Sequence, residues 1–132
     1  MVSKKIKMSC CKTEEDAIDL PPAISRSVGK IGGVNGIARL LPDDKTLESI
    51  SRMHEALSDT VRLKILLALS LTDLCPCVLK RIADVTDSKL SYHLKLLENA
   101  SLIESARDGR WVIYTITQKG RKAVEEMNIN HH

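Results

Sequence analysis

The sequence predicts a mainly α-helical fold that carries one small β-hairpin, and three observations support this. Apolar residues recur at spacings of three and four between residues 46 and 99, which is the pattern of amphipathic helices. The period then changes to two in "LIESAR" and "WVIYTIT", on either side of an Asp-Gly pair that is typical of a tight hairpin turn. A last helical pattern, "QKGRKAVEEM", follows the hairpin.

Two amphipathic helices are expected first. Residues 46–57 form one stripe, with Asp44 or Thr46 as the expected N-cap. The stripe consists of Leu47, Ile50, Met53 and Leu57. The next helix lies in "DTVRLKILLALS", where Ser58 or Asp59 is the expected cap. Its inward side consists of Val61, Ile65, Leu66 and Leu69.

A short third helix is expected from about Pro76 to Asp84, and a fourth begins where Thr86 or Asp87 is the N-cap. The apolar stripe of the fourth helix consists of Leu90, Leu94 and Leu97. A short helix, a turn and an amphipathic helix make a helix-turn-helix, and the hairpin after it is then a wing. The sequence thus predicts a winged helix-turn-helix DNA-binding domain over residues 46–132.

Residues 1–45 are expected to be an extension with at most short helical pieces. They hold four of the six glycines and three of the four prolines in the chain. The segment "GKIGGVNG" lacks the Gly-Lys-Ser/Thr ending of a phosphate loop. The glycines of the extension therefore do not indicate nucleotide binding.

The fourth helix is the candidate DNA-reading element, because the second helix of a helix-turn-helix enters the major groove. Arg107 and Arg110 flank the wing turn, where we expect them to reach a minor groove or the phosphate backbone of DNA. Lys80–Lys122 holds nine Lys and Arg against five Asp and Glu, which suits a surface that faces phosphates. The alternative is an ordinary solvated face of a helical bundle. The candidate contacts on the polar side of the helix are Ser88, Lys89, Ser91, Tyr92 and Lys95.

Three other side chains in this part of the chain are expected to have structural roles. His93 is beside Leu94 on a half-apolar face, so we expect a packed, hydrogen-bonded histidine rather than a ligand. Trp111 and Tyr114 are expected to pack in the hairpin rather than to form a stacking platform for bases.

The composition narrows the class of protein. The 132 residues carry a formal net charge of +3, with no secretory signal and no apolar stretch long enough to span a membrane. We expect a cytoplasmic protein, a compartment in which clustered cysteines more often bind metal or react than form disulfides. No acid–base pair and no nucleotide loop indicates catalysis, so an enzyme is not expected.

Cys75 and Cys77 flank Pro76 just ahead of the predicted helix-turn-helix. Inside a helix, residues two apart point in nearly opposite directions, but Pro is favoured as the first helical residue. We therefore expect Cys75 as the N-cap, which lets the two sulfur atoms converge. A helix N-terminus also lowers the pKa of a thiol, and the thiolate is the form that binds metal. Cys10 and Cys11 are the candidates that complete a metal site.

These segments resemble the ArsR/SmtB family of metal(loid)-sensing winged-helix repressors. "ALSDTVRLKIL" is similar to the family's entry helix, "DLCPCVLKRIADVTDSKLSYHLKLLENASLI" to its Cys-x-Cys and recognition helices, and "RDGRWVIYTIT" to its wing. The similarity covers roughly residues 41–127. It implies a homodimer, usually paired through the first and last helices, that represses resistance operons and leaves operator DNA when an inducer binds.

The chain resembles the cadmium/lead- and arsenic-responsive members, whose N-terminal cysteines join the Cys-x-Cys pair. Four thiolates suit Cd(II) or Zn(II), and three suit As(III), Sb(III) or Pb(II).

Three departures from the family limit the comparison. Leu79 and Lys80 stand where many arsenic sensors carry a third cysteine, and Cys10 and Cys11 are adjacent in this chain. Gln118 and Gly120 replace ligands of a second family site, so that site is expected to be absent.

The hypothesis from the sequence is therefore a repressor released from DNA by a soft ion. A thiol-redox or persulfide sensor on the same fold is the alternative, in which Cys75 and Cys77 pair with each other or with Cys10 and Cys11. Buried cysteines without chemistry are less expected, because one pair is at a helix start and the other on a polar segment.

Overall fold

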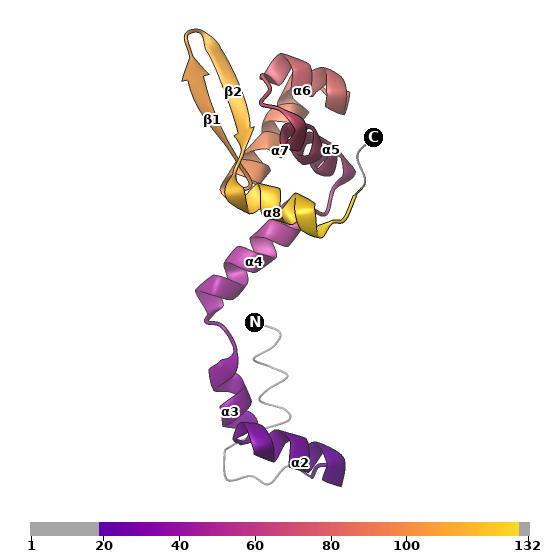
Figure 1. Cartoon of the computed structure of the whole chain (residues 1–132), viewed down its shortest axis with the longest axis vertical. Coiled ribbons are helices and arrows are strands. Elements are labelled where there is room, and N and C mark those ends of the chain that lie inside the picture. The colour runs from indigo at the N-terminus through magenta and orange to yellow at the C-terminus, as the bar shows by residue number, and fades with distance from the viewer. Residues whose placement is uncertain (1–18, 130–132) are drawn as a thin grey trace. The chain divides into compact units, whose positions relative to one another are not determined.

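The computed structural model describes residues 19–129, and the chain divides into two compact units, Met1–Pro42 and Asp43–His132 (Figure 1). The first unit contains α2 (Pro22–Ile31) and α3 (Gly33–Leu40). The second contains α4 (Asp44–Ala56), α5 (Thr60–Leu71), α6 (Pro76–Ala83), α7 (Asp87–Asn99), β1 (Ile103–Asp108), β2 (Trp111–Ile116) and α8 (Gln118–Glu126). None of the helices between residues 19 and 129 combines the length and apolar character that a membrane crossing requires.

The second unit has the predicted order of four helices, a hairpin and a final helix. The hairpin projects away from the helices, and α8 begins at the base of the hairpin and crosses beneath α5 and α7 in the view of Figure 1. A hairpin that follows the second helix of a helix-turn-helix is the wing of the predicted fold. The winged helix-turn-helix arrangement is thus confirmed.

Side-chain caps fix where the helices of the second unit begin. Asp59 accepts hydrogen bonds from the backbone N–H of Val61 and Arg62 at 2.7 and 3.2 Å, so the expected cap of α5 is confirmed. The expected caps of α4 are wrong by one residue or more. Asp43 has extended backbone and accepts from the N–H of Thr46 at 2.9 Å, so α4 begins at Asp44.

The hairpin turn differs from the expected Asp-Gly turn by one residue. Asp108 pairs with Trp111, so Asp108 is the last residue of β1 and the turn consists of Gly109 and Arg110. Gly109 has a φ of 64°, whereas Arg110 has no positive φ. Glycine at the first of two turn residues is the pattern of a type II′ turn, whose twist matches that of the strands.

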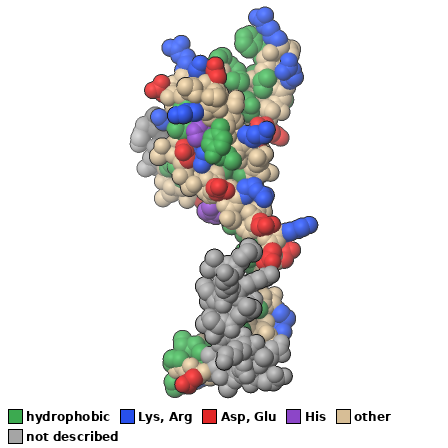
Figure 2. All heavy atoms as spheres, turned by 180° about the vertical axis from the view of Figure 1, so that it is seen from behind, with side chains coloured by type: hydrophobic (Ala, Val, Ile, Leu, Met, Phe, Trp, Pro, Cys, Tyr) green, Lys and Arg blue, Asp and Glu red, His purple; other side chains and the backbone are tan. Residues whose placement is uncertain are grey.

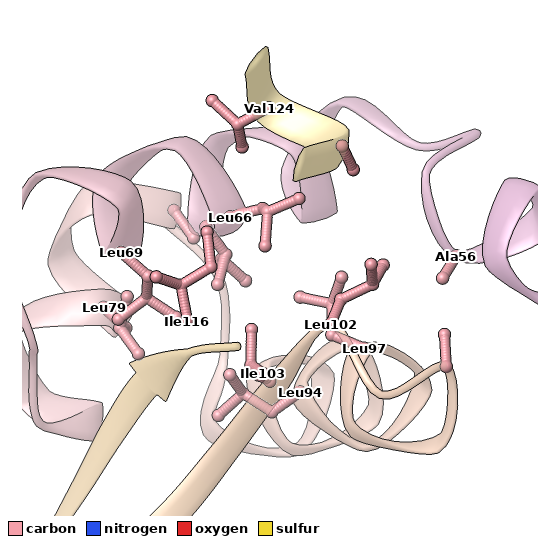
Figure 3. Close-up of a cluster of buried hydrophobic side chains, with 14 of the residues drawn as sticks. Ala56, Leu66, Leu69, Leu79, Leu94, Leu97, Leu102, Ile103, Ile116 and Val124 are labelled. Carbon is pink, nitrogen blue, oxygen red and sulfur yellow. The ribbon is translucent and has the colours of Figure 1, made fainter. Parts of the chain in front are cut away.

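The core of the second unit is formed mainly by leucine and isoleucine side chains of α5, α6, α7 and both strands, with Ala123 and Val124 from α8 and Ala56 from the end of α4 (Figure 3). Ile65, Leu66 and Leu69 from α5 are at most 1% exposed. The stripe of α7 is buried as predicted, through Leu90, Leu94 and Leu97. Val61 is only half-buried, because it lies in the first turn of α5, at the margin of this cluster.

The first unit is held together differently. Gly32, with a φ of 103°, ends α2 in the left-handed conformation and turns the chain into α3. Gly36 is the buried residue of the two helices, and a Cβ there would lie 2.2 Å from the carbonyl oxygen of Ile31. Only glycine permits this close approach of α3 to the end of α2.

Candidate metal site and nucleic-acid interface

The cysteine pair has the geometry that the sequence predicts. Cys75 is the N-cap of α6, with extended backbone at φ −93° and ψ 163°, and Pro76 is the first helical residue. The two sulfur atoms of Cys75 and Cys77 converge to 2.9 Å. The Cys75 carbonyl accepts from the N–H groups of Val78 and Leu79, both at 3.1 Å, which fixes its backbone to the first turn of α6.

The two thiols have opposite pKa shifts. The hydrogen bond from Cys77, followed by that from the backbone N–H of Val78, holds the pKa of Cys75 below its ordinary value. The same thiol–thiol bond, together with burial, raises the pKa of Cys77. Cys75 is therefore the first of the two to become a thiolate, and it does so at a helix N-terminus, where negative charge is favoured.

A soft metal ion fits this pair only if further ligands join it. Two thiolate sulfur atoms bound to one tetrahedral Zn(II) lie about 3.8 Å apart, because each Zn–S bond is about 2.3 Å long. The sulfur atoms of Cys75 and Cys77, now 2.9 Å apart, would therefore have to separate slightly to hold an ion. Within residues 19–129, no group of three or more His, Cys, Asp and Glu side chains is placed to hold a metal. Cys10 and Cys11, the candidate additional ligands, lie outside the described residues.

The second family site, which the sequence predicts to be absent, would meet a steric obstacle in α8. A Cβ on Gly120 would lie 2.2 Å from the backbone oxygen of Leu102 and 2.8 Å from a side-chain carbon of Ile116. Position 120 therefore has no space for a ligand side chain, whatever residue is placed there.

The candidate DNA contacts of α7 lie on one exposed side of the helix, opposite its buried stripe. Tyr92 is 60% exposed, and the N-terminus of the helix is capped by Thr86, which accepts from the N–H of Lys89 at 3.3 Å. An open depression of about 540 Å³ adjoins that end. The exposed candidates are Ser88, Lys89, Ser91, Tyr92 and Lys95. The depression is lined by Lys80, Asp84, Val85, Thr86, Asp87 and Lys89.

The comparisons with known proteins agree on one family. Residues 59–105 match the model described as bacterial regulatory protein, arsR family. The arsenical resistance operon repressor of Bacillus subtilis is 40% identical over 81 residues, which are 58% of this chain and 77% of that protein. This chain belongs to the ArsR family. A homologue of the cadmium resistance regulatory protein CadC from Staphylococcus aureus is 31% identical, over 62% of this chain and 69% of that protein.

A solved structure supports the fold of this ArsR-family chain. It is the homodimeric winged helix-turn-helix DNA-binding domain Mb0332 from Mycobacterium bovis, with a TM-score of 0.55. It is 22% identical and covers 70% of this chain and 97% of that domain. ArsR-family proteins are DNA-binding transcriptional regulators rather than enzymes, which agrees with the class expected from the sequence.

The wing of this ArsR-family chain ends in two arginines and a tryptophan. Arg107 and Arg110 are exposed, and Lys and Arg side chains mark the tip of the hairpin in Figure 2. Trp111 was expected to pack in the hairpin, but it is 52% exposed because it is next to the turn, beyond the helices. The guanidinium of Arg110 instead lies over its ring, with Cζ 5.2 Å from the ring centroid. Tyr114 does pack against the core.

A buried pair, Arg62 and His93, joins α7 to the rest of the domain, and the sequence indicates only the role of His93. His93 is 8% exposed, and its Nδ1 lies 2.9 Å from Nη1 of Arg62, which confirms the expected hydrogen-bonded histidine. Arg62 also donates to the carbonyl oxygens of Ala56 and Glu55, at 2.8 and 3.3 Å. Since arginine has no acceptor, Nδ1 of His93 accepts and its proton is on Nε2.

The sequence pattern does not indicate the role of Arg62, because a charged residue among the apolar residues of α5 is expected to face solvent. The signal that was available is the same irregularity, since an arginine inside a buried stripe needs hydrogen-bond partners. Arg62 therefore holds three elements together: the end of α4, the start of α5 and the middle of α7.

Proposed function

We propose that this chain is a transcriptional repressor that binds operator DNA and leaves it when a soft metal or metalloid ion binds its cysteine thiolates. The observation that carries this is the convergence of Cys75 and Cys77 to 2.9 Å at the start of α6, the helix directly before α7. The relatives named for arsenical and cadmium resistance support the same class of inducer. A regulator of this kind acts in the cytoplasm, where its operator is.

The proposed ion site contains Cys75, Cys77, Cys10 and Cys11. The ion brings the thiolates together, and the chain supplies the helix N-terminus that favours their negative charge. Three thiolates suit As(III), Sb(III) or Pb(II), whereas four suit Cd(II) or Zn(II). The number of thiolates that bind therefore distinguishes the two classes of inducer.

The experiment that tests this is one anaerobic titration with two signals. Reduced protein is bound to its promoter DNA, and As(III) or Cd(II) is added while thiolate-to-metal absorption and DNA anisotropy are recorded. We expect both signals to change at the same stoichiometry. Cys75→Ser should abolish the release of DNA and leave DNA binding intact.

Two results would contradict the proposal. Release by a mild oxidant or polysulfide, with no effect of either ion, would indicate a thiol sensor instead. Loss of folding or of DNA binding in C75S would show that Cys75 is structural. A matched control is Ser70→Ala on α5, a polar side chain that lies outside the proposed ion site.

We also propose that α7 and the wing contact the DNA. The support is the shared exposed side of α7 and the exposed Arg107 and Arg110 of the hairpin. Lys89→Ala should weaken operator binding, reduce the dependence of log K on log salt by about 1, and leave ion affinity unchanged. Lys64→Ala, an exposed lysine on α5, is the matched control and should bind as the unaltered chain does.

A homodimer is the proposed assembly, with α4 in the interface. Leu47 and Ile50 are 45% and 43% exposed on α4, which leaves an apolar stripe on a helix that carries few core residues. Leu47→Glu should therefore shift the chain from dimer to monomer in sedimentation velocity. Leu71→Glu, at a leucine that is 69% exposed at the end of α5, should leave the dimer unchanged.

A further inference from the structure

The residue before the cysteine pair is part of the wing. The N–H of Leu74 donates to the carbonyl oxygen of Tyr114 at 3.1 Å, and the N–H of Tyr114 donates back to Leu74 at 2.8 Å. This reciprocal pair is the hydrogen-bonded unit of an antiparallel ladder, so Leu74 is a one-residue third strand beside β2. The backbone thus connects directly from the edge of β2 to Cys75.

The backbone of Cys75 is held from both sides. On its C-terminal side, its carbonyl accepts from the first turn of α6. On its N-terminal side, only the Leu74 peptide separates it from the two hydrogen bonds to Tyr114. A force on the Cys75 sulfur therefore acts on two elements, the helix α6 that contains Cys77 and the strand β2 that pairs with Leu74.

The middle of the hairpin also contacts the reading helix. Tyr114 is paired with Ser105 across the hairpin, and the hydroxyl of Ser105 donates to Oε2 of Glu98 in α7 at 3.3 Å. The side chain of Tyr114 packs against the core cluster. Tyr114 is therefore at a junction between the segment before Cys75, the partner strand and the C-terminal half of α7.

We propose that Leu74 and Tyr114 are positioning residues that transmit ion binding at the cysteine pair to the wing. Binding of the ion then moves the wing, together with Arg107 and Arg110 at its tip. Release of DNA therefore begins at the hairpin as well as at α7. This inference rests on the proposed function, since it requires an ion at Cys75 and Cys77.

The chain contains its own reporter for this movement. Trp111 is the only tryptophan, and it lies in β2 three residues from Tyr114. It is 52% exposed and stacks with Arg110, so its emission depends on the conformation of the wing tip. In the reduced full-length chain without DNA, we expect Cd(II) to change Trp111 emission at the same stoichiometry as thiolate-to-metal absorption.

Two substitutions at one position separate the backbone bonds from the side chain. Leu74→Pro removes the N–H that donates to Tyr114, whereas Leu74→Ala removes most of the side chain and keeps both hydrogen bonds. In L74P we expect unchanged absorption on ion binding, a lost Trp111 response, and at least a threefold smaller effect of the ion on operator affinity. In the unaltered chain that effect is expected to lie between about 5-fold and 150-fold. In L74A we expect the emission response and the ion effect to be retained.

Hydrogen exchange on the unaltered chain covers the case in which L74P does not fold. We expect Cd(II) to change the exchange of the Leu74 and Tyr114 amides. The inference is overturned if exchange changes in α6 and α7 alone while Trp111 emission stays constant. It is also overturned if L74P and L74A transmit the ion effect equally.

The failure of the proposed function has a different signature. If no ion changes thiolate absorption or DNA binding of the unaltered chain, the proposed function and this inference both fail. If the ion binds and releases DNA while Trp111 emission and the exchange of the Leu74 and Tyr114 amides stay constant, only the proposed route through Leu74 and Tyr114 is wrong. In C75S the emission should not respond to Cd(II), and a response there would show quenching unrelated to the site.

Discussion

The two compact units of this chain have amphipathic helices in common but differ in what those helices contact. In the unit Asp43–His132, α5 and α7 bury their apolar stripes in one core. In the described part of the unit Met1–Pro42, residues 19–42, several apolar side chains of α2 and α3 remain exposed, between 47% and 75% for Ile24, Val34 and Leu40. An amphipathic pattern is therefore accompanied by a helix in both units, whereas the described residues form a buried core only in the unit Asp43–His132.

The helix ends show the same difference. In the second unit, α4, α5, α7 and α8 each begin with a side chain that accepts from the backbone, and these caps are Asp43, Asp59, Thr86 and Thr117. The caps of α2 and α3 are Pro21 and Gly32, which make no side-chain hydrogen bond. The helices of the first unit thus begin without the stabilisation that a cap gives in the second.

Truncation of one apolar side chain in each unit gives the largest expected contrast. Leu66 is fully buried in α5, so Leu66→Ala should destabilise the second unit by about 2–5 kcal/mol through lost burial and a cavity. Ile24→Ala in α2, at a residue 48% exposed, should change stability by less than about 0.5 kcal/mol. Urea unfolding followed by circular dichroism measures both. A large effect of I24A would mean that α2 is covered by a partner.

Glycine-to-alanine changes should have opposite signs in the two units. A Cβ on Gly120 would lie 2.2 Å from the Leu102 oxygen, so Gly120→Ala should cost up to about 3 kcal/mol. In α2, no atom of the described residues lies within 4 Å of a Cβ placed on Gly29, so Gly29→Ala should stabilise α2 by about 0.5–1 kcal/mol. Thermal unfolding tests the first change, and amide exchange of α2 tests the second. Equal effects of the two substitutions would remove this difference between the units.

The hydrogen bond between Arg62 and His93 can be removed by one substitution of His93 and replaced by another. His93→Leu leaves an N–H of the buried Arg62 without its acceptor, which should cost about 1–3 kcal/mol and weaken operator binding. His93→Asn places an amide oxygen close to where Nδ1 was, so it should recover most of the stability. Unfolding and DNA binding of both variants measure this. If H93N and H93L behave alike, the hydrogen bond is not what holds α7.

In the second unit, the elements can be predicted from the sequence where local patterns and tertiary packing agree. The α7 stripe, the Pro76 start of α6 and the converging sulfurs of Cys75 and Cys77 all follow from periodicity and helix-start rules. The errors are local, since Asp43 rather than Asp44 caps α4 and Gly109 rather than Asp108 begins the turn. Such one-residue shifts depend on backbone angles that a single sequence does not determine.

What the sequence did not predict depends on contacts between distant residues. Arg62 and His93 are 31 residues apart, and Leu74 and Tyr114 are 40 residues apart in number. No local pattern in the sequence indicates either contact. The first is a hydrogen bond between two side chains and the second a pair of backbone hydrogen bonds, and both form only when the chain folds. Cys10 and Cys11, which we propose as further ligands of the ion, lie outside the described residues.

The smallest expected effect is a pH dependence that belongs to the second unit. Burial works to raise the pKa of Asp59, but hydrogen bonds from the backbone N–H of Arg62 and Val61 outweigh it and leave the pKa below its ordinary value. The stabilisation by this cap is therefore complete above the ordinary aspartate pKa of about 3.9 and is lost as pH falls through the lowered value. Asp59→Ala should cost about 1 kcal/mol at neutral pH.

Asp59→Asn separates the charge from the cap. Asparagine caps a helix about as well as aspartate but does not titrate, so D59N should be nearly as stable as the unaltered chain at pH 7. As the pH falls below about 4, the unaltered chain should lose stability relative to D59N, because Asp59 takes up a proton on unfolding and the asparagine of D59N does not. Urea unfolding at several pH values measures the difference. Parallel curves for the two proteins would show that the charge of Asp59 adds nothing to the stability that its cap hydrogen bonds give α5.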